Sequence, residues 1–131
     1  MTPKELSNLF YLNIEIEREE ERLKSLEEAA TNISTQISGL PHVSGISDKT
    51  ALASEIADTK AIIEHKNKEA IIEYNRIMRY IAKIDDSYMR QIITLRYIDG
   101  RSWANIAMII GGNNTPDSVR MAHNRFLLRM K

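Results

Sequence analysis

The stretch from Ser102 to Arg120, SWANIAMIIGGNNTPDSVR, decides the fold of the C-terminal part of this chain. Ser102 and Thr115 are suited to cap helices, because their hydroxyl oxygens accept the unpaired N–H groups of a first helical turn. Pro116 suits the first helical position, where no N–H partner is needed. The residues Gly111-Gly-Asn-Asn114 favour a turn. The stretch therefore predicts two short helices joined by a glycine-containing turn, the helix-turn-helix, whose second helix lies in a DNA major groove.

A third helix is expected just before this motif. Asp85-Asp86-Ser87 offers capping side chains, and a helix over 87–98 is predicted to follow. Gly100 can end that helix in the left-handed conformation that glycine permits. With helices over about 102–110 and 116–129, residues 85–131 are predicted to form a three-helix domain of the helix-turn-helix type.

The apolar period of the last predicted helix separates a buried face from a free one. The buried positions are expected to be Val119, Ala122, Phe126 and Leu127. The free faces carry the candidate DNA-contacting residues Asp117, Ser118, Arg120, Met121, Asn124 and Arg125. Arginine suits guanine edges, asparagine suits adenine, and methionine suits the thymine methyl group. Ser102 and Thr115, at helix starts, are candidates for binding phosphate oxygens.

The charge distribution supports the same end of the chain as the DNA-binding part. The formal net charge of the whole chain is zero. Residues 87–131 nevertheless hold seven Lys/Arg and two Asp, a net +5, whereas residues 1–86 carry a net −5. A basic part within an otherwise acidic chain is the expected electrostatic footprint of DNA binding.

The N-terminal part predicts a long helix with a coiled-coil seam. Thr2 and Glu5 have the spacing of a capping box. Apolar residues then recur at alternating steps of three and four, which is typical of a coiled coil. The ten seam positions, nine of them apolar, are Leu9, Leu12, Ile16, Glu19, Leu23, Leu26, Ala30, Ile33, Ile37 and Leu40. Because Pro41 disfavours helical geometry in the residue before it, the helix is expected to end near Ser38-Gly39.

A second long helix is predicted after a connector at about 38–47. It is expected to begin at Ser47 or Asp48 and to run to about Ile84, with a less complete seam. A single turn-containing connector between helices of similar length favours an antiparallel hairpin. Parallel pairing with a second chain uses the same apolar positions and stays open. Residues 1–84 are therefore assigned to a helical oligomerisation region, and the predicted fold class is all-α.

Composition narrows the function classes. The chain has no cysteine, which removes disulfides and thiolate metal sites and suits a reducing compartment. No apolar run reaches the length of a membrane span, and we expect a cytoplasmic protein. The three histidines are dispersed, so no metal or other cofactor is expected. No nucleophile–base pair or phosphate-cradling loop occurs, and we expect no enzyme activity.

The C-terminal residues carry a resemblance to a known family. LRYIDGRSWANIA over 95–107, followed by Ser118-Val-Arg120 and Asn124-Arg-Phe-Leu127, resembles region 4 of bacterial sigma factors, which reads the −35 promoter element. With its long helical N-terminal part, the whole chain is similar to the ArpU/RinA-like phage regulators of late-gene transcription. By this resemblance Asp117, Ser118, Arg120 and Met121 face bases and Arg125 faces the DNA backbone. Between Ala107 and Val119 this chain is about two residues longer than the usual motif.

Three functional hypotheses follow. The first is a sequence-specific transcription regulator that binds double-stranded DNA as a homodimer or higher oligomer, since one recognition helix reads only a few base pairs. The second is a DNA-packaging or assembly subunit of the small-terminase type, which would form rings. The third is an interaction module that binds RNA polymerase or another protein rather than DNA.

Overall fold

The computed structural model describes the backbone of residues 1–37 and 43–130, and the side chains of residues 1–32 and 49–130. The described residues form helices, turns and no strand, so the predicted all-α class is confirmed. The helices are α1 (Pro3–Leu6), α2 (Asn8–Ile37), α3 (Val43–Ala82), α4 (Ser87–Ile93), the π-helical segment η1 (Thr94–Ile98), α5 (Trp103–Ile110) and α6 (Pro116–Arg129). They contribute to two compact units, one of residues 13–69 and one of residues 1–12 with 70–131.

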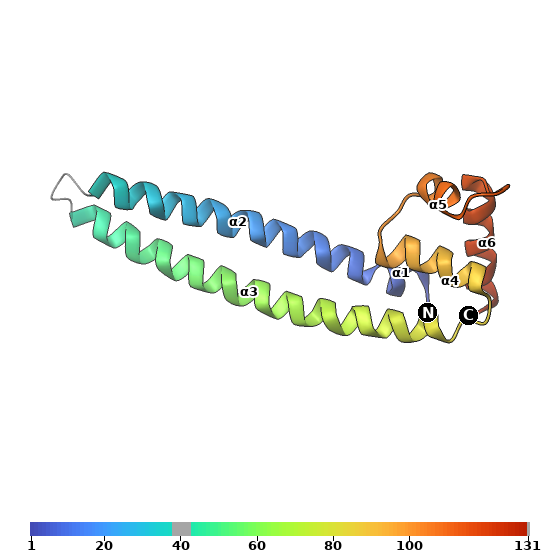
Figure 1. Ribbon diagram of the computed structural model, residues 1–131. Helices are drawn as coiled ribbons and strands as arrows, with labels where there is room; N and C mark the ends of the chain where they lie inside the picture. The colour runs from blue at the N-terminus through green and yellow to red at the C-terminus, as the bar shows by residue number, and fades with distance from the viewer. Residues whose placement is uncertain (38–42, 131) are drawn as a thin grey trace. The chain divides into compact units, whose positions relative to one another are not determined.

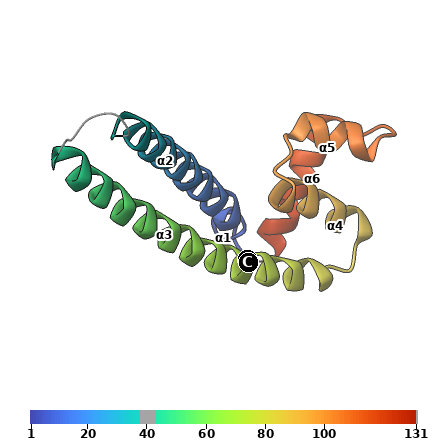
Figure 2. The ribbon, with the colours of Figure 1, turned by 60° about the vertical axis from the view of Figure 1, so that its left-hand side comes forward.

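The unit of residues 13–69 is an antiparallel helical hairpin. Its parts of α2 and α3 run in opposite directions (Figures 1 and 2), and Lys66 Nζ lies 2.9 Å from Glu15 Oε2 across them. Every described seam position in this unit is buried or half-buried: Ile16, Glu19, Leu23, Leu26 and Ala30 on α2, and Leu52, Ile56, Thr59, Ile63 and Lys66 on α3. The predicted seam and the antiparallel pairing within one chain are therefore confirmed.

Polar side chains interrupt this seam. Thr59 is 1% exposed, and its hydroxyl donates to the Glu55 carbonyl at 2.8 Å, so its burial leaves no donor unpaired. The hydrogen bond from Lys66 to Glu15 raises the pKa of the lysine. Because alternative registers would break this pair, polar seam residues favour a defined alignment of the two helices.

The bounds of the long helices differ from those predicted. The first is interrupted at Ser7, whose hydroxyl donates to the Pro3 carbonyl and which separates α1 from α2. The second begins at Val43, so residues 43–47 of the expected connector are helical and the start predicted at Ser47 or Asp48 is wrong. The glycine and serines of 43–47 were interpreted as turn formers, but such residues lower helix propensity by at most about 1 kcal/mol each and do not forbid a helix. The expected end at 38–39 lies outside the described residues.

The second unit has a single core that draws on both ends of the chain. Its buried residues include Leu6 and Leu9 from the N-terminal segment, and Ile77, Ile81 and Ile84 from the end of α3 and the residue after it. From the C-terminal helices come Met89, Ile92, Ile93, Tyr97, Ile106, Ala107, Val119 and Leu127. This unit therefore extends beyond residues 85–131, the domain expected from sequence.

The helices of the C-terminal part match the predicted ranges closely. Asp86 caps α4 through its carboxylate, which accepts the Tyr88 N–H at 3.1 Å. The helix predicted over 87–98 changes at Thr94 into a π-helical turn, in which Asp99 N–H bonds to the Thr94 carbonyl. Gly100 then adopts a φ of +66°, as expected for the residue that ends this helix.

Candidate nucleic-acid interface

The starts of α5 and α6 are capped as predicted. Ser102 Oγ accepts the Asn105 N–H at 3.2 Å. Thr115 Oγ1 accepts the Ser118 N–H at 3.0 Å, and Ser118 Oγ accepts the Thr115 N–H at 2.8 Å, which completes a capping box. The Ser118 hydroxyl also donates to the Thr115 carbonyl, so this side chain serves the helix itself. Ser102 and Thr115 are exposed, and a hydroxyl that accepts an N–H keeps its own hydrogen as a donor.

The long turn between α5 and α6 is held in place from a distant residue. Gly111 has φ +76° and ψ −158°, and Gly112 has φ +65°, conformations that favour glycine. Asn114 Nδ2 donates to the Gly111 carbonyl at 2.8 Å, while its Oδ1 accepts from the Tyr88 hydroxyl at 2.8 Å. The residues from Gly111 to Asn114 thus form an ordered turn that is fastened to α4. Sequence reasoning missed this contact, because nothing local connects Tyr88 with Asn114.

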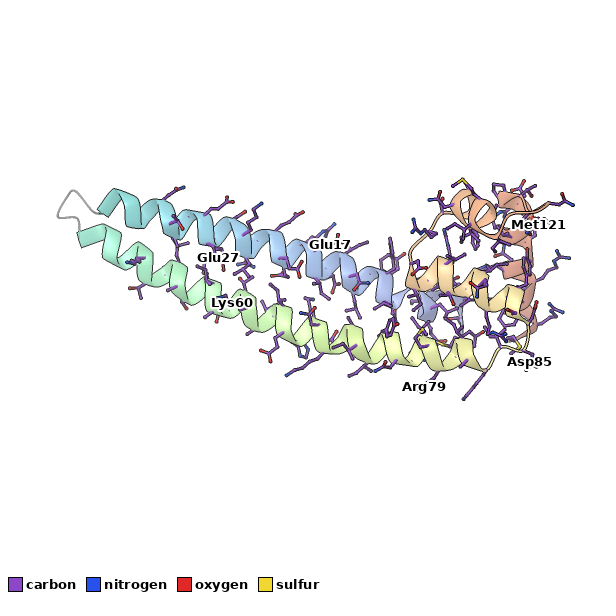
Figure 3. The ribbon with its side chains drawn as sticks, viewed as in Figure 1. Glu17, Glu27, Lys60, Arg79, Asp85 and Met121 are labelled. Atoms are coloured by element: carbon purple, nitrogen blue, oxygen red, sulfur yellow. The ribbon has the colours of Figure 1, made fainter. Side chains whose placement is uncertain are left out.

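Helix α6 has the predicted division into buried and free faces. Val119 and Leu127 are buried, and Ala122 and Phe126 are half-buried. Six of the candidate residues, Asp117, Arg120, Met121, Asn124, Arg125 and the capping Thr115, are exposed. Met121, labelled in Figure 3, is 51% exposed. Ser118 is the one candidate on this helix that is half-buried.

The exposed residues of α6 fall into a central stripe with an arginine on each side. Asp117, Met121, Asn124 and Leu128 follow one another at i, i+4, i+7 and i+11, which aligns them along the helix. At about 100° per residue, Arg120 and Arg125 point about 140° apart and flank this stripe. The exposed face of α6 therefore combines a central stripe of mixed character with a basic side chain on each flank.

Both arginines are only weakly engaged within the protein. Arg120 lies 3.5 Å from Asp117 Oδ1, and both side chains are exposed. Exposed pairs of this kind contribute about 0–1 kcal/mol, so another acceptor can replace the carboxylate at little cost. Arg125 Nε donates to the Met121 carbonyl at 3.4 Å, near the limit for a hydrogen bond. Each guanidinium therefore remains able to bind an external acceptor.

Behind this face lies a buried aromatic cluster, which we define as Tyr97, Trp103 and His123. The His123 ring is 4% exposed and packs edge-on against Trp103, with ring centroids 4.8 Å apart. The Tyr97 hydroxyl is hydrogen-bonded to His123 Nε2. Trp103 is half-buried, with the Arg96 guanidinium 4.3 Å above its ring. Arg96 also donates to the Arg101 carbonyl at 3.0 Å.

Burial sets the protonation of this cluster. Loss of solvent lowers the pKa of His123, and the nearby Arg96 charge lowers it further, while a hydrogen bond with Asn124 opposes both. Burial raises the pKa of Tyr97 to about 12. At neutral pH the pair therefore consists of an uncharged imidazole and a protonated phenol.

No protein-family model, curated protein or solved structure matches this chain. Over the described residues, no group of three or more His, Cys, Asp or Glu is placed to hold a metal ion. None of the described helices combines the length and apolar character that a membrane crossing requires.

Proposed function

We propose that this chain is a sequence-specific transcription regulator that binds double-stranded DNA through α6 and acts as a homodimer or higher oligomer. The observation that carries the proposal is the exposed stripe of α6, flanked by two weakly engaged arginines and braced from behind by α5 and α4. The resemblance to sigma region 4 and to ArpU/RinA-like regulators favours late-gene control in a phage or prophage. Such a protein would act in the cytoplasm of the bacterial host.

The residue types on α6 divide into base readers and phosphate binders. Arg120 is proposed to make two hydrogen bonds to a guanine edge, and Met121 to lie against a thymine methyl group. Arg125, on the opposite flank, is proposed to bind the phosphate backbone. Ser102 and Thr115 are proposed to donate their hydroxyl hydrogens to phosphate oxygens at the starts of α5 and α6.

Oligomerisation is proposed to occur through α3. Ile71, Tyr74 and Met78 follow one another at i, i+3 and i+7 on this helix and are 60%, 42% and 37% exposed. A contiguous set of exposed apolar side chains often marks a surface that binds another protein. Pairing of two copies would present two recognition helices and supply the half-site spacing that a regulator needs.

The decisive experiment is selection of bound sequences from a random duplex pool, followed by binding measurements on the enriched site. Arg120→Ala is expected to weaken specific binding by about 1–3 kcal/mol and to relax the preference at one position. Arg125→Ala is expected to weaken binding to all sequences and to reduce the salt slope by about 1. Arg22→Ala, an exposed arginine on α2, serves as the matched control.

Failure to enrich any sequence would exclude specific DNA binding, and intact specific binding in the Arg120→Ala/Arg125→Ala double variant would exclude α6 as the reader. The mass in solution tests the second hypothesis, because a ring would favour a packaging subunit of the small-terminase type.

One feature favours the protein-binding alternative. A hollow of about 500 Å³ lies between α4 and α6, with Met89, Ala122 and Leu128 among its apolar lining residues. If DNA binding is absent, this hollow is the surface at which RNA polymerase or another protein would be tested, with Leu128→Glu as the disrupting variant.

A further inference from the structure

Asn124 lies on the DNA-facing stripe of α6, but its amide is not free to turn. The residue is exposed and follows Met121 by one helical turn. Its Oδ1 lies 2.9 Å from Nδ1 of the buried His123. An amide oxygen carries no hydrogen, so the imidazole must donate in this bond and Asn124 must accept.

This bond determines the tautomer of His123. A neutral imidazole has one N–H, which the contact with Asn124 places on Nδ1. Nε2 is therefore the acceptor for the Tyr97 hydroxyl, which keeps its proton at neutral pH. Each partner in the chain Tyr97–His123–Asn124 thus donates to the next.

The imidazole that directs this bond is itself held rigidly. Its ring centroid lies 5.5 Å from that of Tyr97 and 4.8 Å from that of Trp103. Trp103 also contacts the Arg96 guanidinium. Because packing locks the His123 rotamer, the Nδ1–H points in a fixed direction and keeps the Asn124 oxygen turned toward the buried side of α6.

We propose that Asn124 contacts DNA only as a hydrogen-bond donor, through Nδ2, and that His123 is the positioning residue that imposes this role. The inference rests on the proposed function of α6. Adenine is ordinarily recognised by asparagine through two bonds, in which Oδ1 accepts from N6 and Nδ2 donates to N7. That contact requires both amide atoms to face the groove, and here Oδ1 is held by His123. The partner is therefore an acceptor: N7 or O6 of a purine, O4 of thymine, or a phosphate oxygen.

Two substitutions at Asn124 separate donation from acceptance. Asn124→Asp keeps an acceptor for His123 but removes both N–H groups, and Asn124→Ala removes the whole amide. Both variants are expected to lose about 2- to 12-fold in affinity for the selected site, the worth of one neutral hydrogen bond. The added charge of aspartate is corrected by measuring each variant on a non-specific duplex as well. A loss confined to the selected site places the acceptor on a base, and an equal loss of Asn124→Ala on both duplexes places it on a phosphate.

Modified DNA tests the absence of the adenine contact. In the selected site each adenine is replaced in turn by purine, which lacks the N6 amino group but keeps N7. The loss caused by Asn124→Ala is expected to remain the same on every such duplex. If one purine substitution removes the effect of Asn124→Ala, Asn124 accepts from that N6 group and the inference is wrong. Equal binding of wild type and Asn124→Ala on all duplexes would also overturn it.

The positioning role of His123 is tested by measuring which base each variant prefers at the selected site. If His123 only stabilised the fold, replacing it would not change this base preference. In the Tyr97→Phe/His123→Phe variant both partners of the buried hydrogen bond are removed together, which limits the cost in stability. Asn124 is then free to turn, and the selected preference is expected to shift toward adenine at one position. Tyr97→Phe alone keeps the Nδ1–H to Asn124 bond and is expected to leave the preference unchanged.

An unchanged preference in the folded double variant would overturn the role of His123. If the double variant does not fold, the Asn124 and purine measurements still decide whether donation is exclusive. If the arginine variants bind DNA as the wild type does, the proposed function of α6 is itself contradicted. Altered binding in the arginine variants, with a negative result at Asn124, would contradict this inference alone.

Discussion

His123 joins the last helix to the two elements that precede it. It bonds to Tyr97 of η1, packs on Trp103 of α5 and belongs to α6. Its ring is almost fully buried, so its protonation must be accommodated within the cluster rather than by solvent. The stability of the three-helix arrangement is therefore expected to depend on pH.

The free energy of unfolding is expected to fall as the pH is lowered below about 6.5, the ordinary histidine value. Burial lowers the pKa of His123 in the folded state, so the unfolded chain takes up this proton first. The stabilisation is complete above the unfolded pKa and is lost as the pH falls toward the folded pKa. Urea unfolding followed by circular dichroism between pH 5 and 8 measures this dependence.

His65 provides the control, because it is exposed on α3 beside Glu69. His65→Gln is expected to keep the pH dependence of the wild type, and His123→Phe to flatten it. The same slope in both variants would contradict the assignment to His123.

The exposure of single residues on α6 could be predicted from the helical period, because this prediction uses only the spacing of residues within the helix. The period placed Val119 and Leu127 inward and Arg120, Met121 and Arg125 outward, and the structure agrees. The bonds of Tyr97 with His123 and of Tyr88 with Asn114 could not be predicted in this way. Each joins residues 26 positions apart, and such pairs form only once the tertiary fold brings their helices together.

At the scale of elements, the turn between α5 and α6 depends on the backbone conformation of a single glycine. Gly111 combines positive φ with an extended ψ, a conformation that is essentially restricted to glycine. No atom lies within 4 Å of the position that a Cβ would occupy there. Glycine is therefore required here by the backbone conformation, and not by a lack of space for a side chain.

Gly111→Ala is expected to destabilise the protein by about 1–3 kcal/mol, because alanine is strained in this conformation. Thermal and denaturant unfolding measure the change. Asn113→Ala, at an exposed position in the same turn, is the control and is expected to change stability by less than about 0.5 kcal/mol. Equal stability of Gly111→Ala and wild type would show that the turn adopts another conformation.

Helix starts were predicted well where the signal was a local cap. Thr2, Asp86, Ser102 and Thr115 all cap helices, and each cap acts on a backbone N–H two or three residues ahead. The start of α3 at Val43, the interruption at Ser7 and the π-helical turn were missed.

At the scale of the molecule, the core of the second unit needs residues that sequence reasoning assigned to the hairpin. A fragment of residues 85–131 lacks Leu6, Leu9, Ile77 and Ile81, all of which are buried in that core. We expect the fragment to unfold without a cooperative transition, since it exposes the surfaces that these side chains cover. Circular dichroism during thermal unfolding tests this expectation, with the full chain as reference, and a cooperative transition in the fragment would refute it.

The apolar stripe on α3 gives a test of assembly. Ile71→Lys together with Met78→Lys is expected to convert an oligomer into monomers, because burying two unpaired charges opposes association. DNA affinity is then expected to fall at least about tenfold, as the avidity of two heads is lost. Mass in solution and binding to the selected site provide the readouts. Ala61→Lys, at an exposed position elsewhere on α3, should preserve both, and an unchanged mass in the double variant would place the interface elsewhere.

The shared core of Leu6 and Leu127 also has a consequence for synthesis on the ribosome. Leu6 is made well before Leu127, whose helix completes this core. At 5–20 residues per second, the N-terminal segment waits about 6–24 s for residue 127 to be added. The hairpin of residues 13–69 has no such delay, because its two helices follow one another in the chain. We therefore expect the nascent protein to acquire its hairpin before it completes the core that Leu6 and Leu127 share.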